Sequence, residues 1–315
     1  MGWIASPLKL KRLTVLGLNK RNADVVMRYN PRHLYPLVDD KLKTKQKALS
    51  QQISVPELYG VVEIQHQVKT LEPLLAAHTE FVIKPAQGSG GNGIVVIVGR
   101  FGKNYKKPNG DLISFDFIQH HISNVLSGMY SLGGVTDKAI IEYRVQSDPF
   151  FESLSYQGVP DIRVIVFRGV PIAAMVRLPT RASDGKANLH QGAVGMGIDL
   201  ATGISRKGVI RNKICTLHPD TEKNIEGLTI PNWNAILTLA IRCADLVGLG
   251  YLGVDIVMDK YLGPMMLELN ARPGLNVQLA NQQGLGHNLD KVAAITQLPT
   301  SVEERLTLAQ TLSLN

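Results

Sequence analysis

The sequence predicts an α+β fold in which helices are interleaved with antiparallel hairpins. Runs of β-branched and aromatic residues are separated by short turns in three places, at residues 81–98, 161–180 and 251–270. These hairpins do not follow the regular strand–helix–strand alternation that produces a parallel sheet. No internal repeat and no low-complexity linker divides the chain. We therefore expect mixed or antiparallel sheets.

Helices are expected where apolar residues recur at helical spacing or where helix-forming residues cluster. These segments are residues 41–53, 73–78, 117–129, 232–250 and 285–297. Residues 1–37 are basic and broken by prolines, and the apolar stretch Leu13–Leu18 predicts a short arm or a strand–turn lead-in. The main domain is expected at residues 38–295, with a glycine-rich hairpin part at about 81–140, a second part at about 141–295, and a tail at 296–315.

Composition narrows the classes of partner. The chain has 315 residues, of which 44% are hydrophobic and 19% are charged, as in ordinary globular proteins. Its formal net charge of +8 fits an anionic substrate or simple solubility. No basic run is interleaved with aromatic residues, so nucleic acid is not expected as a partner. No apolar run is long enough for a membrane helix, so no membrane is expected and the cytoplasm is the default location.

Acidic and amide side chains gather in the last hairpin. Asp255 lies in one predicted strand, and Glu268 and Asn270 lie in the next, two residues apart and therefore on one face. A turn at residues 260–263 can place Asp255 opposite that pair. Oxygen ligands of this kind suit Mg²⁺, with Mn²⁺ as an alternative. The other interpretation is an ordinary hairpin with a solvated acidic face.

A glycine-rich segment follows the strand that ends near Lys84. Successive glycines expose backbone N–H groups and let phosphate oxygens approach closely, and Lys84 supplies a positive charge. The segment matches neither the P-loop pattern nor a dinucleotide fingerprint, and a glycine-rich hairpin turn alone is weak evidence. Together with the acidic hairpin it predicts a site for a nucleoside triphosphate and its metal. The loop residues expected to act are Gly88, Ser89, Gly90, Gly91, Asn92 and Gly93.

Seven motifs in order resemble the ATP-grasp superfamily and, within it, the RimK-type alpha-L-glutamate ligase-like proteins. The resemblance covers residues 38–290. It implies an ATP-grasp fold, in which two α+β subdomains clasp ATP, with the N-terminal domain of such ligases reduced to a short arm. The motifs are DDKLKTKQ, FVIKPAQGSGGNGIVVI, IIEYRV, DIRVIVFRGVPIAAMVRLPT, KANLHQGA, GVDIV and LELNARPGL.

The resemblance also implies roles for charged residues. Lys84 and Lys45, with Lys41 as the near competitor of Lys45, would bind the phosphates of ATP beneath the glycine-rich loop. Arg163 and Arg177 would stabilise charge on the transferring phosphoryl group or the acyl phosphate. The bland interpretation of both arginines is a solvent-facing position on a strand. The metal ligands, for one or two Mg²⁺ ions, would be Asp255, Glu268 and Asn270.

Further nucleotide contacts are implied by the same resemblance. Glu142 and Tyr143 match the hinge that meets adenine and ribose, although an edge charge and a core tyrosine are the plain alternatives. Asp161 matches another nucleotide contact. Asn188 and Lys186 match a triplet near the γ-phosphate, where Lys186 replaces the usual arginine and keeps the charge but not its bidentate geometry.

The function implied is an ATP-dependent carboxylate–amine ligase that forms an amide bond through an acyl phosphate. Glutamate or a similar amino acid is the expected amine, and the carboxylate acceptor is a small molecule, a peptide or a protein tail. Two alternatives stay open: an ATP-grasp small-molecule kinase and a non-catalytic nucleotide-binding protein. The sequence leaves open whether the chain forms a homo-oligomer.

Overall fold

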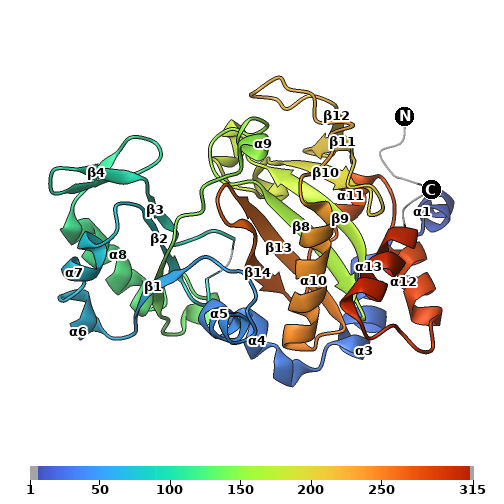
Figure 1. Ribbon diagram of the computed structural model, residues 1–315, viewed down its shortest axis with the longest axis horizontal. Coiled ribbons are helices and arrows are strands. Elements are labelled where there is room, and N and C mark those ends of the chain that lie inside the picture. The colour runs from blue at the N-terminus through green and yellow to red at the C-terminus, as the bar shows by residue number, and fades with distance from the viewer. Residues whose placement is uncertain (1–5, 89, 313–315) are drawn as a thin grey trace. The chain divides into compact units, whose positions relative to one another are not determined.

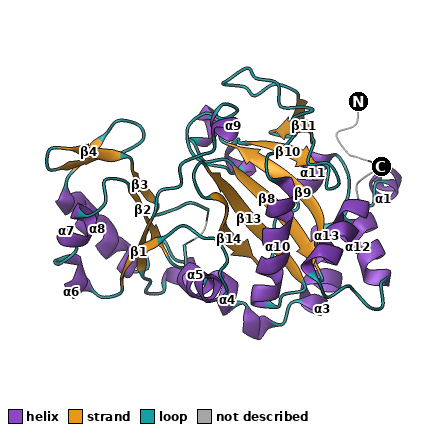
Figure 2. Ribbon diagram, in the orientation of Figure 1, coloured by secondary structure: helices purple, strands orange, loops and turns teal. Residues whose placement is uncertain are grey.

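The computed structural model describes residues 6–88 and 90–312. The chain divides into two compact units, each described by itself (Figure 1). The small unit comprises Asp40–Gln46 and Val55–Val145. The large unit comprises Met1–Asp39, Lys47–Ser54 and Gln146–Asn315. Both units combine helices with strands (Figure 2), which confirms the expected α+β class.

The small unit is built on a four-stranded antiparallel sheet in the order β1-β7-β2-β3. Its hydrophobic core lies between one face of this sheet and helix α8, which begins at a serine cap and buries its apolar side. Phe81 pairs with Ile97 across β2 and β3, so the predicted hairpin at 81–98 is confirmed. The elements are β1 (Leu58–Val62), α6 (Gln65–Val68), α7 (Glu72–Ala76), β2 (Phe81–Pro85), β3 (Val95–Ile97), α8 (Phe115–Leu126) and β7 (Ala139–Glu142).

The opposite face of this sheet carries polar residues. Ile83 and Ile141 belong to the hydrophobic core, so their strand neighbours Lys84 and Glu142 point the other way. Helix α5 (Lys41–Ser50) contributes Leu42 to a small apolar cluster on that second face. A second sheet of three short strands was not expected from the polar turn at 106–111. Its strands are β4 (Gly99–Phe101), β5 (Asn104–Lys106) and β6 (Leu112–Ile113).

The large unit contains a seven-stranded sheet in which every neighbouring pair is antiparallel. The predicted hairpins at 161–180 and 251–270 are both confirmed, and they lie side by side because β8 pairs with β13. In sheet order the strands are β12 (Lys213–Cys215), β11 (Ser205–Ile210), β10 (Val194–Ile198), β9 (Val170–Leu178), β8 (Asp161–Phe167), β13 (Tyr251–Asp259) and β14 (Gly263–Asn270).

Helices cover this sheet. Helix α10 contacts β8, β9, β13 and β14, and α11 contacts β9, β10 and β11. The expected tail at 296–315 contains a helix, α13, which packs on α10 and β9 and is fixed by an ion pair of 2.6 Å between Arg305 and Asp245. The helices are α9 (Pro149–Glu152), α10 (Trp233–Val247), α11 (Asn276–Asn281), α12 (Gly286–Ala294) and α13 (Val302–Thr311).

The N-terminal segment is helical, and the strand considered at Leu13–Leu18 is wrong. The segment is also tied to the large unit. The side chain of Gln278 accepts from the backbone N–H of Leu16 at 2.8 Å, and Asn30 bonds both backbone groups of Tyr251. Long-range contacts of this kind override a local β preference. The segment forms α1 (Pro7–Arg12), α2 (Leu18–Lys20), a π-helical turn (Arg21–Val26), α3 (Met27–Tyr29) and α4 (Pro36–Asp39).

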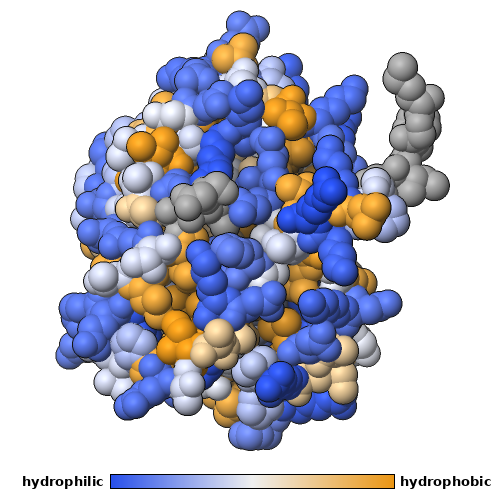
Figure 3. All heavy atoms as spheres, turned by 90° about the vertical axis from the view of Figure 1, so that its right-hand side faces the viewer, coloured by the Kyte–Doolittle hydropathy of each residue, from blue (hydrophilic) through white to orange (hydrophobic). Residues whose placement is uncertain are grey.

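Hydrophilic and hydrophobic residues are interspersed on the face shown in Figure 3. Within residues 6–88 and 90–312, no helix has both the length and the apolar character that crossing a bilayer requires.

Candidate active site

Three buried charges form the polar centre of the small unit. The ammonium of Lys84 lies 2.6 Å from Oε1 of Glu142, and the ammonium of Lys45 lies 2.8 Å from Oε2. Lys84 comes from β2, Glu142 from β7 and Lys45 from α5. The cluster exists because Val82 pairs with Glu142, which puts Lys84 two residues further along on the same face. All three side chains are at most 6% exposed.

Two positive charges and one negative charge leave this cluster with an excess of one positive charge. Burial alone would raise the pKa of Glu142, but Lys84 and Lys45 outweigh it and hold that pKa below its ordinary value. Burial lowers the pKa of Lys45 to about 8. The positive charge of Lys84 lowers this pKa further, whereas the negative charge of Glu142 acts to raise it. A buried, incompletely neutralised pair of lysines is suited to an anionic ligand such as a phosphate group.

The glycine-rich loop follows directly from β2. Gly90, Gly91 and Gly93 all have positive φ, a conformation that side chains with a Cβ rarely adopt. A Cβ on Gly93 would come within 2.5 Å of the ring of Tyr130, so this position also needs glycine for space. Gly88 is fixed by a bridge to Ser131, and Asn92 lies exposed in the turn. Ser89, also expected to act here, lies outside the described residues.

Lys41 lies beside this loop. Its ammonium donates to the carbonyl oxygen of Gly88 at 2.5 Å, and its backbone N–H donates to the carbonyl of Ala86. The two candidate lysines of α5 therefore have different positions: Lys45 joins Lys84 and Glu142, whereas Lys41 joins the glycine-rich loop. Helical spacing of four residues puts both on one side of α5.

Charged residues of the large unit lie in two transverse rows across the sheet. In one row Glu268 pairs with Asp255, and Asp255 pairs with Arg163. In the adjacent row, two residues along the strands, Asp161 pairs with Arg177. Paired residues of antiparallel strands point to the same face, so all five side chains share one surface. The chain thus gathers the predicted arginines and carboxylates from four strands.

Asp255 is the hub of this cluster. Arg163 donates two hydrogen bonds to it, from Nε to Oδ1 at 2.7 Å and from Nη2 to Oδ2 at 2.6 Å. Arg177 donates to Oδ2 of Asp255 at 2.9 Å and also makes a bidentate pair with Asp161. The Nδ2 of Asn270 donates to Oδ2 of Asp255 at 3.2 Å. Both arginines are mainly buried, so the solvent-facing alternative does not hold.

The two aspartates differ in their protonation behaviour. For Asp255, burial acts to raise the pKa, but the charges and hydrogen bonds of Arg163 and Arg177 outweigh it and lower the pKa to about 2. For Asp161, burial dominates, and with the repulsion of Asp255 it raises the pKa to about 6 against the attraction of Arg177. Asp255 is therefore the firmly ionised member of the cluster.

The oxygen-bearing residues fit a magnesium ion by their chemistry. Glu268 lies directly opposite Asp255, and Asn270 follows two residues later on the same face. Mg²⁺ typically uses one or two protein carboxylates and completes its shell with water and phosphate oxygens. Oδ1 of Asp255 accepts one arginine hydrogen bond, whereas Oδ2 accepts three. Among the described residues no three His, Cys, Asp or Glu side chains form a metal group.

The remaining predicted residues lie in connecting segments. Tyr143 follows β7, and its backbone N–H donates to the carbonyl of Glu57 at 2.8 Å. Lys186 lies in a turn and is half-buried. Oδ1 of Asn188 accepts from the backbone N–H of His190 at 3.0 Å and caps the 3-10 turn Leu189–Gln191. These contacts give Tyr143 and Asn188 structural roles in the described chain, and the nucleotide roles of all three residues stay predictions.

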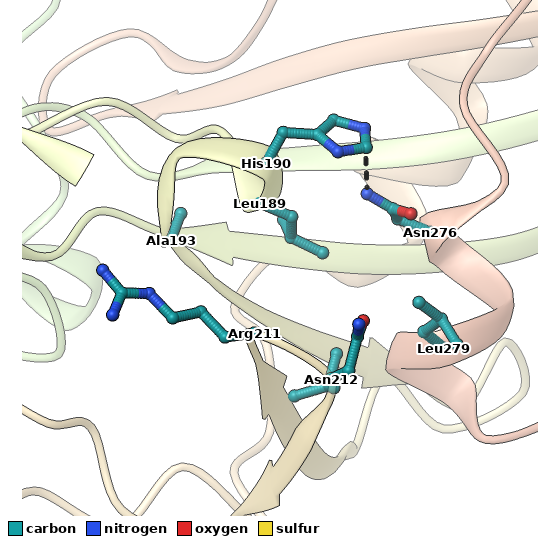
Figure 4. A pocket seen from close by; sticks show the side chains of 8 residues that line it. Leu189, His190, Ala193, Arg211, Asn212, Asn276 and Leu279 are labelled. Carbon is teal, nitrogen blue, oxygen red and sulfur yellow. Dashed lines mark hydrogen bonds between the residues drawn. The ribbon is translucent and has the colours of Figure 1, made fainter. Parts of the chain in front are cut away.

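A pocket next to this 3-10 turn was missed from the sequence. It is a cavity of about 230 Å³ inside the large unit (Figure 4). The sequence feature that could have indicated this pocket is the two-residue turn Arg211–Asn212 between β11 and β12, because the end of that hairpin lies beside the segment that follows Asn188. The lining residues are Leu189, His190, Ala193, Val209, Arg211, Asn212, Asn276 and Leu279.

Comparison with known proteins identifies the family to which this chain belongs. The model of the family described as sugar-transfer associated ATP-grasp matches residues 20–294. A protein of Maridesulfovibrio salexigens named probable alpha-L-glutamate ligase is 29% identical over 124 residues, which are 39% of this chain and 30% of that protein. The chain therefore matches less than a third of that relative's length.

Solved structures resemble the chain weakly. The D-alanine–D-alanine ligase of Bacillus anthracis, solved with ATP, has a TM-score of 0.47 and 13% identity over 90% of this chain and 69% of its own. The ATP-grasp ligase PsnB, solved with a minimal precursor, has a TM-score of 0.46 and 17% identity over 84% of this chain and 63% of its own. At these scores the structures say nothing about substrates. The family match confirms the expected superfamily and fold: the chain belongs to the sugar-transfer associated ATP-grasp family.

Proposed function

We propose that this protein is an ATP- and Mg²⁺-dependent ligase that joins a carboxylate to an amine through an acyl phosphate. The observation that carries the proposal is the cluster in which Arg163, Arg177, Glu268 and Asn270 surround Asp255 on one sheet face. A cluster of this kind supplies positive charge and oxygen ligands together, which phosphoryl transfer requires. Membership of an ATP-grasp family and the match to a probable alpha-L-glutamate ligase support the same proposal.

Lys45 and Lys84 are proposed to bind phosphate oxygens of ATP. Their cluster carries one uncompensated positive charge. Each ammonium has three donors, of which Lys84 gives one to Glu142, while Lys45 gives one to Glu142 and one to the carbonyl oxygen of Pro56, so both can still donate to a phosphate. The glycine-rich loop adjoins Lys84 in sequence and offers backbone N–H groups at positions 90–93. Glu142 would position the two ammonium groups rather than contact the base.

Glu268, Asn270 and Oδ1 of Asp255 are proposed to hold magnesium. When bound there, the ion would neutralise charge on the phosphates of ATP. Asn270 would have to turn its amide so that Oδ1, not Nδ2, faces the ion, which is a simple rotation of the side chain. Arg163 keeps Asp255 ionised and in place, because its two hydrogen bonds fix the plane of the carboxylate.

The reaction needs positioning more than covalent help from the protein. An oxygen of the substrate carboxylate attacks the γ-phosphorus of ATP, the bond to the β–γ bridging oxygen breaks, and ADP leaves. Arg177 stabilises the charge that develops on the transferred group. The amine nitrogen then attacks the acyl carbon, the acyl–oxygen bond breaks, phosphate leaves, and the amine proton passes to solvent. No nucleophilic side chain is required.

The test is phosphate release by purified protein with ATP, Mg²⁺ and a panel of carboxylate and amine pairs. Because the family is described as sugar-transfer associated, the panel includes amino sugars and sugar acids beside amino acids. Glu268→Gln removes one proposed ligand charge at nearly constant volume, and we expect phosphate release to fall at least a hundredfold. Glu303→Gln on α13, an exposed position outside the cluster, is the matched control and should retain activity.

The panel also separates the alternatives. A stable phosphorylated product formed without any amine would identify a small-molecule kinase. ATP binding without turnover in every mixture would identify a nucleotide-binding protein without catalysis. Unchanged phosphate release in Glu268→Gln would refute the metal assignment.

A further inference from the structure

The cavity beside the Asn188 segment has two kinds of wall. Its apolar part is formed by Leu189, Val209 and Leu279, with Ala193. Its polar part includes a hydrogen-bonded pair, since Nδ2 of Asn276 lies 3.3 Å from Nε2 of His190 (Figure 4). The volume of about 230 Å³ is below the range of about 300–1,000 Å³ of pockets for drug-sized ligands. The cavity is therefore suited to a small molecule and not to a nucleotide.

The charge of the lining is positive. None of the residues that line the cavity is an aspartate or a glutamate, and one, Arg211, is an arginine. Within the described chain no residue makes an ion pair or side-chain hydrogen bond with the Arg211 guanidinium, whereas Arg206 on the preceding strand β11 pairs with Asp199 at 3.0 Å. An arginine at the edge of an apolar cavity is a specific partner for a carboxylate.

The backbone does not explain why an arginine occupies position 211. Arg211 and Asn212 form the two-residue turn between β11 and β12, with φ of 45° and 64°. A turn of this kind requires positive φ whatever residue occupies it, and Arg168 adopts a φ of 50° in the turn between β8 and β9. Asparagine and glycine adopt this conformation most readily, so the turn accounts for the φ at position 211 but not for the choice of arginine there.

Val209, which lines the cavity, lies on the same sheet face as Arg177 of the arginine cluster. Val209 pairs with Gly195, and Gly195 pairs with Arg177, so these residues form one transverse row on the same face. Strands are spaced about 4.8 Å apart, which puts Val209 about 10 Å from Arg177 along this row. Leu189 lies over Gly195, since a Cβ on that glycine would come within 2.5 Å of it. Leu189, which lines the cavity, thus lies over the strand position between Val209 and Arg177.

We infer that this cavity binds a small aliphatic carboxylate, which serves as one of the two organic substrates of the ligase. This inference rests on the proposed function. The exposed side chain of Arg211 extends away from Asn212 and Leu279 in Figure 4, and it turns toward the cavity to bind the carboxylate. The aliphatic body then covers Leu189, Val209 and Leu279. A dicarboxylate such as glutamate is disfavoured, because its second charge would lie against the apolar wall.

The test is calorimetric titration of the whole chain, without ATP or Mg²⁺, with isovalerate, L-leucine, L-glutamate and the uncharged 3-methylbutanol. Isovalerate, L-leucine or both should bind, and 3-methylbutanol should not. Binding of L-leucine alone identifies the amine substrate, and binding of isovalerate alone identifies the carboxylate that is activated. Tighter binding of L-glutamate than of either, or equal binding of 3-methylbutanol, would overturn the inference.

Variants assign the binding to this cavity. Arg211→Gln should weaken it at least tenfold, and Leu279→Trp, at a half-exposed position, should block it by filling the space. Lys213→Gln is the matched control, because it removes one positive charge from the same hairpin without lining the cavity. Thermal unfolding of each variant confirms that it is folded. Binding that Arg211→Gln leaves unchanged would contradict the assignment.

Failure of this inference and failure of the proposed function give different results. ATP-dependent ligation without binding of any carboxylate in this cavity rejects the inference alone. Carboxylate binding that depends on Arg211, in a protein that never turns over ATP, rejects the proposed ligase activity alone.

Discussion

Replacing Glu142 with glutamine tests whether the lysine cluster of the small unit is held by one buried carboxylate. Glu142 is only 2% exposed and lies 2.6 Å and 2.8 Å from the ammonium groups of Lys84 and Lys45. The variant keeps the shape of the side chain but leaves two buried positive charges without an anion. Breaking a buried ion pair from one side costs about 3–5 kcal/mol.

The lower end of that range is expected, because one lysine can lose its proton. Lys45, whose pKa is already lowered to about 8 by burial, is the one that responds. A loss of about 3 kcal/mol corresponds to a fall in Tm of about 12–24 °C for a domain of about a hundred residues. The assay is urea denaturation for the free energy of unfolding, with differential scanning calorimetry for Tm.

The matched control is Glu80→Gln, which breaks the ion pair of Glu80 with Arg144 in the same unit. Those side chains are 35% and 23% exposed, so their contact is worth at most about 1 kcal/mol. If Glu142→Gln destabilises the protein no more than Glu80→Gln does, the described burial of the cluster is wrong.

Two further predictions concern the small unit. The pKa of Lys45 in the folded protein is about 8, below its ordinary value of 10.5, so between these pH values the unfolded chain holds more protons and the stability contributed by Lys45 rises with pH. Lys45→Met should flatten this rise in the free energy of unfolding, measured by urea denaturation between pH 7.5 and 10.5, and an unchanged slope would contradict the lowered pKa. Gly93→Ala should destabilise the protein by about 1–3 kcal/mol more than Gly90→Ala, because both glycines have positive φ but only Gly93 lies against Tyr130. Thermal unfolding measures the difference between the two variants, and equal losses of stability would argue against the contact with Tyr130.

Local patterns were sufficient to predict the three hairpins. Each has two apolar strands and a turn within about twenty residues, so the pairing partner is the next strand along the chain. The spacing of Glu268 and Asn270 placed them correctly on one face with Asp255. Helices with a clear apolar stripe, such as α8 and α10, were also predicted close to their observed bounds.

Pairings between distant segments could not be predicted in this way. Arg163 lies 92 positions before Asp255 and meets it only because β8 lies beside β13, and the intervening sequence contains no sign of that pairing. The contact of Lys45 with Glu142 depends likewise on α5 packing over β7. The strand considered at Leu13–Leu18 failed because Gln278, far along the chain, binds the backbone of Leu16.

The central claim is that a carboxylate is activated as an acyl phosphate, and transfer of isotopic oxygen tests it most directly. The protein is incubated with ATP, Mg²⁺, an amine and a carboxylate labelled with heavy oxygen, and the released phosphate is analysed by mass spectrometry. Our account predicts that each amide formed is matched by one phosphate carrying a labelled oxygen, because the acyl–oxygen bond breaks in the second step. Amide formation with unlabelled phosphate, or a stable phosphorylated product and no amide, would contradict it.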